Sequence, residues 1–86
     1  MSVLIIACDL KEPNFDYQPL YDALAVINAV QLQDSTWGVR TASTSSAIFD
    51  YLWPHVYSEK DRMFVVPFDK RAGYKSKNAI NPLKDV

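Results

Sequence analysis

Hydrophobic positions along the chain follow two different periods, one typical of strands and one typical of helices. Residues 3–8 and 62–68 are short apolar runs rich in β-branched side chains, and their length favours strands over helices. Pro67 predicts that the second of these strands ends there or lies at a sheet edge, because proline donates no ladder hydrogen bond. Residues 36–41 alternate between two unlike sets of side chains, which indicates a third strand.

A helix is predicted between the first two strands, ending near Asn28. Asp16 is placed to cap its first turn, and Pro19 lies in that turn, where its missing N–H does little harm. The apolar face of this helix repeats at i, i+3, i+4 and i+7 and consists of Leu20, Ala23, Leu24 and Ile27. Such a face must pack against a neighbouring layer.

A second helix is predicted within the stretch TASTSSAIFDYLWP. Ser43 or Thr44 is its expected N-cap, and Pro54 ends it near Trp53. Its apolar face consists of Ile48, Tyr51 and Leu52. Two helices of this length can cover only one face of a sheet.

Two segments leave alternatives open. Residues 29–33 form a short strand, which either makes a hairpin with residues 36–41 or joins them in one bent strand broken near Asp34. Residues 72–74 could add a last short strand. We expect the last ten residues of the chain to be loose.

The order of these elements predicts an α+β fold, a ferredoxin-like β-α-β-β-α-β sandwich with two helices on one face of an antiparallel sheet. The first and last main strands are apolar on both faces, so the face without helices also needs a cover. We expect a second copy of the chain to supply this cover, which predicts a homodimer formed through that face. The alternative is that the tail folds back over it. We place one domain at residues 1–74 and a basic tail at residues 75–86, partly ordered against the partner chain.

Composition agrees with one small globular domain. The chain has 86 residues, of which 49% are hydrophobic and 22% are charged. Its single cysteine allows no internal disulfide and no apolar run is long enough to span a membrane, so we expect a cytoplasmic protein. Charge is unevenly spread: residues 1–61 carry three Lys or Arg against eight Asp or Glu, and residues 62–86 carry six against two. The basic end either attracts nucleic acid or only aids solubility.

Most catalytic motifs are absent, including Gly-rich phosphate loops, CxxC, HExxH and GxSxG. Cys8 is expected to be a small buried hydrophobe. Asp9 is the candidate for catalysis, because a carboxylate at the end of a central strand is rigidly held. In a dimer, two Asp9 carboxylates with waters could hold Mg²⁺ or Mn²⁺ and activate water against a phosphodiester. The alternative is that Asp9 caps the following loop by accepting backbone N–H groups.

Basic and aromatic residues are candidates for contacts with nucleic acid. The cations expected to contact phosphates are Arg40, Lys70, Arg71, Lys75 and Lys77. Phe15, Tyr17 and Tyr74 lie near loops and could stack on bases, although aromatic side chains at such spacing more often pack within the protein. Binding through these cations should weaken steeply as salt rises.

Several segments together resemble the SinR-like branch of the Cas-two family of CRISPR-associated proteins. These segments are LIIACDL, PNFDYQPLYDAL, DSTWGVRT, MFVVPF and RAGY, and they cover residues 3–74. The resemblance implies a ferredoxin-like fold, which VapD-type toxins share, and a homodimer. It also places Asp9 at the family's metal-binding aspartate. Cys8 stands where the family usually has tyrosine, and Asn14 and Phe15 replace its usual glycine.

The resemblance implies two functions. The first is a homodimeric nucleic-acid-binding protein that acts as a metal-dependent endonuclease on RNA or double-stranded DNA through paired Asp9. The second is a catalytically inactive protein on the same fold, which binds another protein or serves as a scaffold in CRISPR adaptation, a toxin-antitoxin system or phage counter-defence. The expected partners are a second copy, RNA or DNA, and another CRISPR or defence-system protein, with no membrane.

Overall fold

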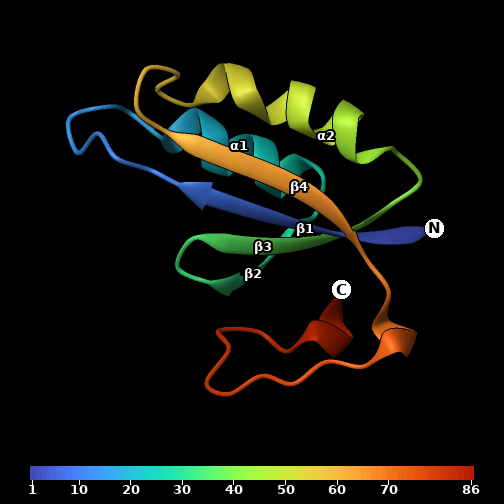
Figure 1. The fold of residues 1–86 in the computed structure, drawn as a ribbon. Coiled ribbons are helices and arrows are strands. Elements are labelled where there is room, and N and C mark those ends of the chain that lie inside the picture. The colour runs from blue at the N-terminus through green and yellow to red at the C-terminus, as the bar shows by residue number, and fades with distance from the viewer.

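Four strands and two helices make up the body of the protein in its computed structural model, which describes all residues from 1 to 86 (Figure 1). In chain order they are β1 (Ser2–Asp9), α1 (Gln18–Val26), β2 (Val30–Gln33), β3 (Thr36–Thr41), α2 (Ser45–Leu52) and β4 (Arg62–Phe68). Three short 3-10 helices lie at Trp53–His55, Lys70–Ala72 and Leu83–Asp85. The main elements follow the β-α-β-β-α-β order that the sequence predicts.

The four strands form one antiparallel sheet in the order β2-β3-β1-β4. Both helices cover the same face of this sheet (Figure 1). The structure is therefore a small α+β fold, consistent with the ferredoxin-like arrangement. β2 and β3 are the two arms of a hairpin, with a turn at Asp34 and Ser35 and a register shift between Gln31 and Gln33.

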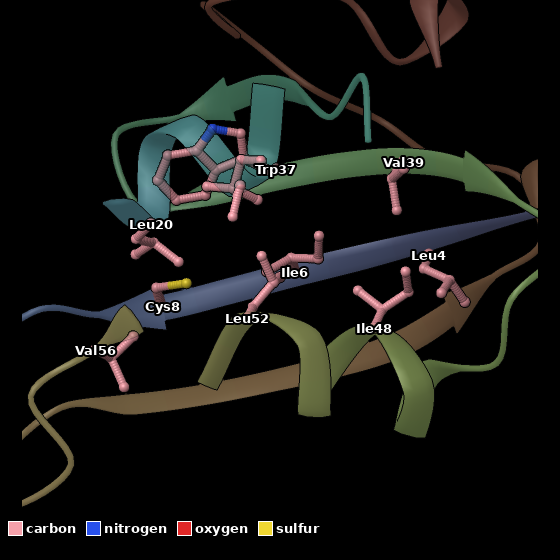
Figure 2. Close-up of a cluster of buried hydrophobic side chains, with 11 residues drawn as sticks. Leu4, Ile6, Cys8, Leu20, Trp37, Val39, Ile48, Leu52 and Val56 are labelled. Atoms are coloured by element: carbon pink, nitrogen blue, oxygen red, sulfur yellow. The ribbon is translucent and has the colours of Figure 1, made fainter. Parts of the chain in front are cut away.

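The core lies between the sheet and the helices (Figure 2). Even-numbered residues of β1 point into it, and Leu4, Ile6 and Cys8 are buried there. The helices contribute the faces that their periodicity predicts, with Leu20, Ala23 and Leu24 buried from α1 and Ile48 and Leu52 from α2. Trp37 and Val39 of β3 complete the core. One sheet face is thus fully used for packing.

Side chains satisfy backbone donors at the starts of both helices. Thr44 is the N-cap of α2, and its hydroxyl accepts the N–H of Ala47 at 3.1 Å. The start of α1 differs from the prediction, because its N-cap is Tyr17 and not Asp16. The Asp16 carboxylate still accepts the N–H of Gln18 at 3.0 Å, so it satisfies a donor of the first turn from one position further out.

Tyr51 of α2 ties the two helices together. The sequence places it on the apolar face of its helix, but Tyr51 is 38% exposed. Its hydroxyl donates to the Ala23 carbonyl of α1 at 3.0 Å.

The end of α1 is followed by Asn28, where φ is 57°. This is a left-handed conformation that asparagine tolerates better than most residues.

β4 lies at the edge of the sheet, as Pro67 predicts. The N–H of Cys8 donates to Ser35 on the β3 side, so the backbone groups of even-numbered β1 residues face β3 and those of odd-numbered residues face β4. Pro67 lies opposite Leu4 in the register. Its nitrogen therefore points to the free edge, where no ladder hydrogen bond is lost.

Residues 72–74 do not form the additional strand that the sequence allows. After β4, the Asp69 carboxylate accepts the N–H of Arg71 at 2.9 Å and starts the 3-10 helix Lys70–Ala72. Gly73 then takes a φ of 96°, which glycine adopts without a steric penalty and which redirects the chain. The capping carboxylate and this glycine together exclude an extended strand here.

Residues 75–86, called the C-terminal segment below, lie on the side of the sheet opposite the helices (Figure 1). The N–H of Ile80 donates to the Leu32 carbonyl at 2.9 Å. Asn81 Nδ2 donates to the Gln31 carbonyl at 2.9 Å. Both bonds tie the segment to β2, so the last ten residues are not loose.

The C-terminal segment covers the β2–β3 half of the second sheet face. Val86 is only 8% exposed and packs over Gly38, which leaves room for it because glycine has no side chain. The fold-back alternative thus describes this half of the face. The β4 side of this face is open in one chain, with Phe64 and Val66 59% and 39% exposed, whereas Val3, Ile5 and Ala7 of β1 are half-buried.

Candidate nucleic-acid interface

Asp9 ends β1 on the face that the helices leave free, because it follows Ile5 and Ala7 in the alternation of the strand. Its side chain is 52% exposed. Lys11 Nζ lies 3.4 Å from Asp9 Oδ2, and Arg62 Nη1 lies 3.9 Å from the same oxygen. Asp9 therefore belongs to an exposed ion-pair cluster, which contributes little to stability.

One chain alone does not provide a metal site at Asp9. No three His, Cys, Asp or Glu side chains lie close enough together to hold an ion. Mg²⁺ and Mn²⁺ prefer several oxygen ligands, and Asp9 offers one carboxylate beside the cations of Lys11 and Arg62. A metal there would need oxygen ligands from a second copy and would have to displace both cations.

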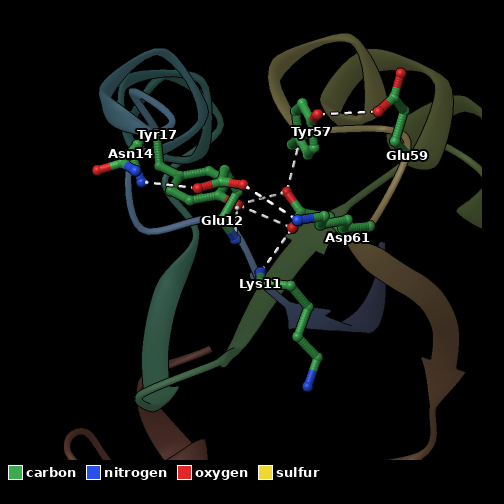
Figure 3. A network of polar contacts seen from close by, with 8 residues as sticks. Lys11, Glu12, Asn14, Tyr17, Tyr57, Glu59 and Asp61 are labelled. Atoms are coloured by element: carbon green, nitrogen blue, oxygen red, sulfur yellow. Dashed lines mark hydrogen bonds and ion pairs between the residues drawn. The ribbon is translucent and has the colours of Figure 1, made fainter.

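Asp61 is the carboxylate that organises this end of the sheet (Figure 3). It is 5% exposed. Its oxygens accept the N–H of Lys11 at 2.7 Å, the N–H of Tyr57 at 2.8 Å and the hydroxyl of Tyr17 at 2.7 and 2.8 Å. These donors belong to the loop after β1, the loop before β4 and the start of α1. Asp61 thus caps the loop that the sequence analysis assigned, as its alternative, to Asp9.

The hydrogen bonds that Asp61 accepts lower its pKa by more than burial raises it. Burial raises the pKa of this carboxyl, but the N–H of Lys11, the hydroxyl of Tyr17 and the N–H of Tyr57 lower it, so that the pKa lies below its ordinary value. Burial, together with the bond to Asp61, raises the pKa of Tyr17 and keeps its hydroxyl protonated. Three donors already occupy this carboxylate: two N–H groups, and one hydroxyl whose single hydrogen is shared between both oxygens.

Asp61 is not among the candidate residues that the sequence pattern indicates. A signal was present, because Asp61 directly precedes β4 as Asp9 directly ends β1. These two strands pair antiparallel, with Asp9 opposite Arg62, so both carboxylates must lie at the same end of the sheet. Which of the two is buried depends on the loops around them.

Arg40, Lys70 and Arg71 line one hollow at the opposite end of the sheet. The wall of this basic hollow also contains Met1, Ser2, Val3, Pro67, Phe68, Asp69 and Val86. Its volume of about 680 Å³ is enough for a nucleotide-sized group. Three of the five predicted phosphate-binding residues are therefore brought together by the fold.

The three cations of the basic hollow differ in what they contact. Arg40 is exposed and takes part in none of the four ion pairs of the chain. Arg71 Nε lies 3.2 Å from Asp69 Oδ1 in an exposed pair. Lys70 Nζ donates to a backbone oxygen of Val86 at 3.0 Å. Arg40 is thus the cation with the least competition for an entering anion.

The remaining predicted site residues lie elsewhere. Lys75 lines a separate depression between the C-terminal segment and the sheet, and Lys77 is exposed without an ion pair. Asp9 lies far from the hollow, because Val3 at the hollow precedes it by six residues of extended strand, roughly 20 Å. The predicted catalytic residue and the predicted phosphate contacts therefore occupy opposite ends of the sheet.

The other candidates have mainly structural surroundings. Burial and the charge of Asp61 raise the pKa of Cys8 to about 11, which makes it an unreactive thiol. The rings of Phe15 and Tyr17 pack together, 4.9 Å between centroids. Tyr74 is different, because its ring meets the Phe68 ring edge-on, with 5.9 Å between the ring centroids. Phe68 lines the basic hollow, so Tyr74 lies beside it.

Comparison with known proteins adds no relative. No family model matches the chain, and a search of curated proteins finds no match. None of the helices combines the length and the apolar character that a membrane crossing requires. The resemblance to the Cas-two family therefore rests on the sequence segments alone.

Proposed function

We propose that the protein binds nucleic acid as a homodimer, through the basic hollow. The observation that carries this proposal is the gathering of Arg40, Lys70 and Arg71 around one hollow. Asp69 is the only acidic side chain that lines it, so the side chains of the hollow are on balance positive and favour an anion. Arg40 lies on β3, and Lys70 and Arg71 lie on the 3-10 helix after β4. Such cations bind phosphates without regard to base sequence and release the counterions of the nucleic acid.

Aromatic side chains beside the hollow favour a nucleic acid over a simple anion. Phe68 lines the hollow, and the exposed ring of Tyr74 packs against it. An exposed ring can stack on a base while nearby cations hold the phosphate, a combination typical of proteins that bind single strands. We therefore expect single-stranded RNA or DNA to bind more tightly than a duplex.

The homodimer is supported by the open β4 side of the second sheet face. Phe64 and Val66 expose neighbouring apolar side chains to solvent there, and such patches usually mark an interaction surface. A second copy related by a two-fold axis would bury both. Each copy would bring its own basic hollow, and two linked hollows would raise the apparent affinity for a long strand.

Fluorescence anisotropy with a labelled single-stranded RNA of about 20 nucleotides tests the binding. One variant replaces the hollow cations with glutamine, at Arg40, Lys70 and Arg71. The matched control removes equal charge at the other end of the sheet, at Lys11, Lys60 and Arg62. We expect the hollow variant to lose at least about tenfold in affinity and the control to lose much less. Equal losses of RNA affinity in the two variants would contradict the hollow as the binding site. If the wild type binds neither RNA nor DNA, the protein-interaction alternative takes its place.

A second candidate function is metal-dependent cleavage at Asp9. The observation that favours it is the position of Asp9, exposed on the free sheet face next to the strip of Phe64 and Val66. A second copy stacked on that strip would bring a second Asp9 to the same interface. Mg²⁺ or Mn²⁺ between two carboxylates would supply a Lewis acid and an activated water.

Cleavage of labelled RNA and duplex DNA with MgCl₂ or MnCl₂ tests this second function. We expect Asp9→Asn to abolish cleavage while sedimentation velocity shows the dimer intact. Asp34→Asn is the matched control, because Asp34 is another exposed aspartate, placed in the β2–β3 turn. If Asp9→Asn cleaves as fast as the wild type, or if neither protein cleaves, the catalytic function is wrong and binding alone remains.

A further inference from the structure

β4 has a free backbone edge on the side away from β1 (Figure 1). Its even-numbered residues lie opposite the odd-numbered residues of β1, whose backbone groups face β4. The N–H and C=O groups of the odd-numbered β4 residues therefore point outward, and these residues are Met63, Val65 and Pro67. None of the turn and loop hydrogen bonds of the chain reaches them. Such an edge is a template for pairing with another strand.

The acceptors of the other edge strand, β2, are already used by the C-terminal segment. The N–H of Ile80 donates to the Leu32 carbonyl at 2.9 Å. Asn81 Nδ2 donates to the Gln31 carbonyl at 2.9 Å. One copy therefore has a single free edge. Pairing through a single free edge about a two-fold axis closes at two copies and does not grow into a fibre, so this geometry fits a second copy.

The side chains of β4 also suit a second copy. Met63 and Val65 lie on the helix side, where they and Phe49 line a hollow of about 310 Å³ between α2 and β4. Phe64 and Val66 are exposed on the other face. A strand added at this edge would meet apolar groups on both of its faces, and β4 itself is apolar on both.

We propose that two copies join their β4 strands edge to edge, antiparallel, with the two-fold axis at Phe64. The result is one sheet with four strands from each copy. Met63 of one copy then lies opposite the partner's Val65, and the two residues exchange both N–H···O bonds. The axis repeats this pair, so every free backbone group of both residues is used. This inference rests on the homodimer of the proposed function and names its interface.

The residues that flank this stretch fix the register. With the axis at Val65, the Pro67 ring of one copy would face the Met63 carbonyl of the other and offer it no donor. With the axis at Met63, Val65 would lie opposite Asp61, whose N–H already donates to the Tyr57 carbonyl at 2.9 Å. Only the proposed axis pairs all the free groups of Met63 and Val65.

Edge pairing also sets a minimum distance between the two Asp9 carboxylates. The two β1 strands are separated by both β4 strands, which makes three spacings of about 4.8 Å, or roughly 14 Å. One ion cannot bridge that gap, because its oxygen ligands lie about 2 Å away. The edge-paired dimer therefore favours binding by two basic hollows over a shared metal.

Cysteine cross-linking of the full chain tests the pairing. At the axis the two Phe64 residues face each other as a non-hydrogen-bonded pair, with Cα atoms about 4.5 Å apart, which a disulfide can span. Phe64→Cys should therefore give mostly disulfide-linked dimer on mild oxidation, at a concentration where the wild type is dimeric. Val66→Cys is the matched control, because the two Val66 positions are offset by four residues, roughly 13 Å, and it should stay mostly reduced. Wild-type protein controls for the buried Cys8.

A proline substitution tests the ladder itself. The Val65 N–H points to the free edge, so Val65→Pro removes no hydrogen bond within one copy but one from each copy across the axis. Sedimentation equilibrium should show a dimer dissociation constant raised at least about tenfold. Val65→Ala keeps the N–H and should lose much less. Circular dichroism checks that both variants are folded.

The outcomes distinguish the edge pairing from the proposed function. A dimer that tolerates Val65→Pro, or that cross-links at Val66→Cys as readily as at Phe64→Cys, overturns the edge pairing and leaves a homodimer of another geometry. A wild type that binds RNA as a monomer overturns the pairing and leaves the hollow as the binding site. An edge-paired dimer that binds neither RNA nor DNA overturns the nucleic-acid function and leaves the interface.

Discussion

Two aspartates at the same end of the sheet have opposite surroundings. The Asp61 carboxylate is buried and accepts hydrogen bonds from three donors, which belong to three different segments. Asp9 is half exposed, and its charged neighbours are Lys11 and Arg62, in two long ion pairs. The first carboxylate therefore fixes the fold, and the second remains accessible to a partner.

Asp61→Asn should destabilise the protein by about 2 to 4 kcal/mol, because it places an amide N–H₂ opposite buried donors and removes the charge that strengthens their bonds. Urea unfolding followed by circular dichroism measures this change. Asp9→Asn is the control and should cost less than about 1 kcal/mol. Similar costs for the two variants would show that Asp61 does not hold the three segments together.

Acid should weaken the native state through Asp61. The pKa of this carboxyl is lowered by folding from its ordinary value of 3.8, so the unfolded chain binds the proton more readily. Its contribution is therefore fully present above 3.8 and is lost as the pH falls through the lower folded value. Urea midpoints measured at decreasing pH should fall more steeply in this range for the wild type than for Asp61→Asn. Parallel curves would contradict this assignment.

The position of Asp9 could be predicted from the sequence, but its surroundings could not. An apolar run that ends in a carboxylate places that carboxylate at a strand end. The loop-capping role belongs to Asp61, whose donors Tyr17 and Lys11 lie 44 and 50 residues away in the chain. Such contacts depend on how loops pack across the sheet, which no local pattern encodes.

At the scale of elements, the segments with a regular period are the ones the sequence predicts well. Both helices repeat every 3.6 residues and β3 every 2 residues, and the predicted apolar residues of these three elements are buried, except that Tyr51 is exposed and Ile27 is only partly buried. The hydrophobic residues of the C-terminal segment follow no regular repeat. Single residues such as Ile80 and Val86 attach this segment to the sheet, so no repeat predicts its position. The 3-10 helix at Lys70–Ala72 was not predicted. Its N-cap, Asp69, can be recognised only when the turn of the chain at Gly73 is known.

The packing of Val86 on Gly38 can be tested by a double-mutant cycle. A methyl group added at Gly38 would lie 3.0 Å from Val86 Cγ2 and 3.3 Å from Leu32 Cδ1. Gly38→Ala should therefore destabilise the protein by about 1 to 2 kcal/mol. In a Val86→Ala background the added methyl meets less resistance, so the same substitution should cost clearly less by urea unfolding. Strict additivity of the two changes would mean that Val86 does not sit on Gly38.

At the scale of the whole molecule, three cations gather around the hollow at one end of the sheet, and the other end holds cations that pair with carboxylates. Register explains the basic end, because Val3 pairs with Arg40 on one side and with Phe68 on the other. This brings Arg40 next to the start of the basic final stretch of the chain. The sequence shows the uneven charge, but the hollow follows only from the pairing of strands that are distant in the chain.

Dimerisation should depend on the open strip of the second face. Phe64→Ser should raise the dimer dissociation constant by at least about tenfold, because it removes the largest exposed apolar side chain of the strip. Sedimentation equilibrium measures this. Val26→Ser is the matched control, since Val26 is an exposed apolar residue of α1, on the helix side of the molecule. Equal association of the two variants, or a wild type that stays monomeric, would show that this strip is not a dimer interface.

The salt dependence of RNA affinity tests the basic hollow most directly. Anisotropy titrations at increasing NaCl concentration give the slope of log K against log salt for the wild type and for the variant with glutamine at Arg40, Lys70 and Arg71. Each phosphate contact on a single strand contributes about 0.7 to this slope, so we expect the variant's slope to be shallower by about 2. The control variant at Lys11, Lys60 and Arg62 should keep the slope of the wild type. Identical slopes for the wild type and the hollow variant would contradict phosphate binding in the hollow.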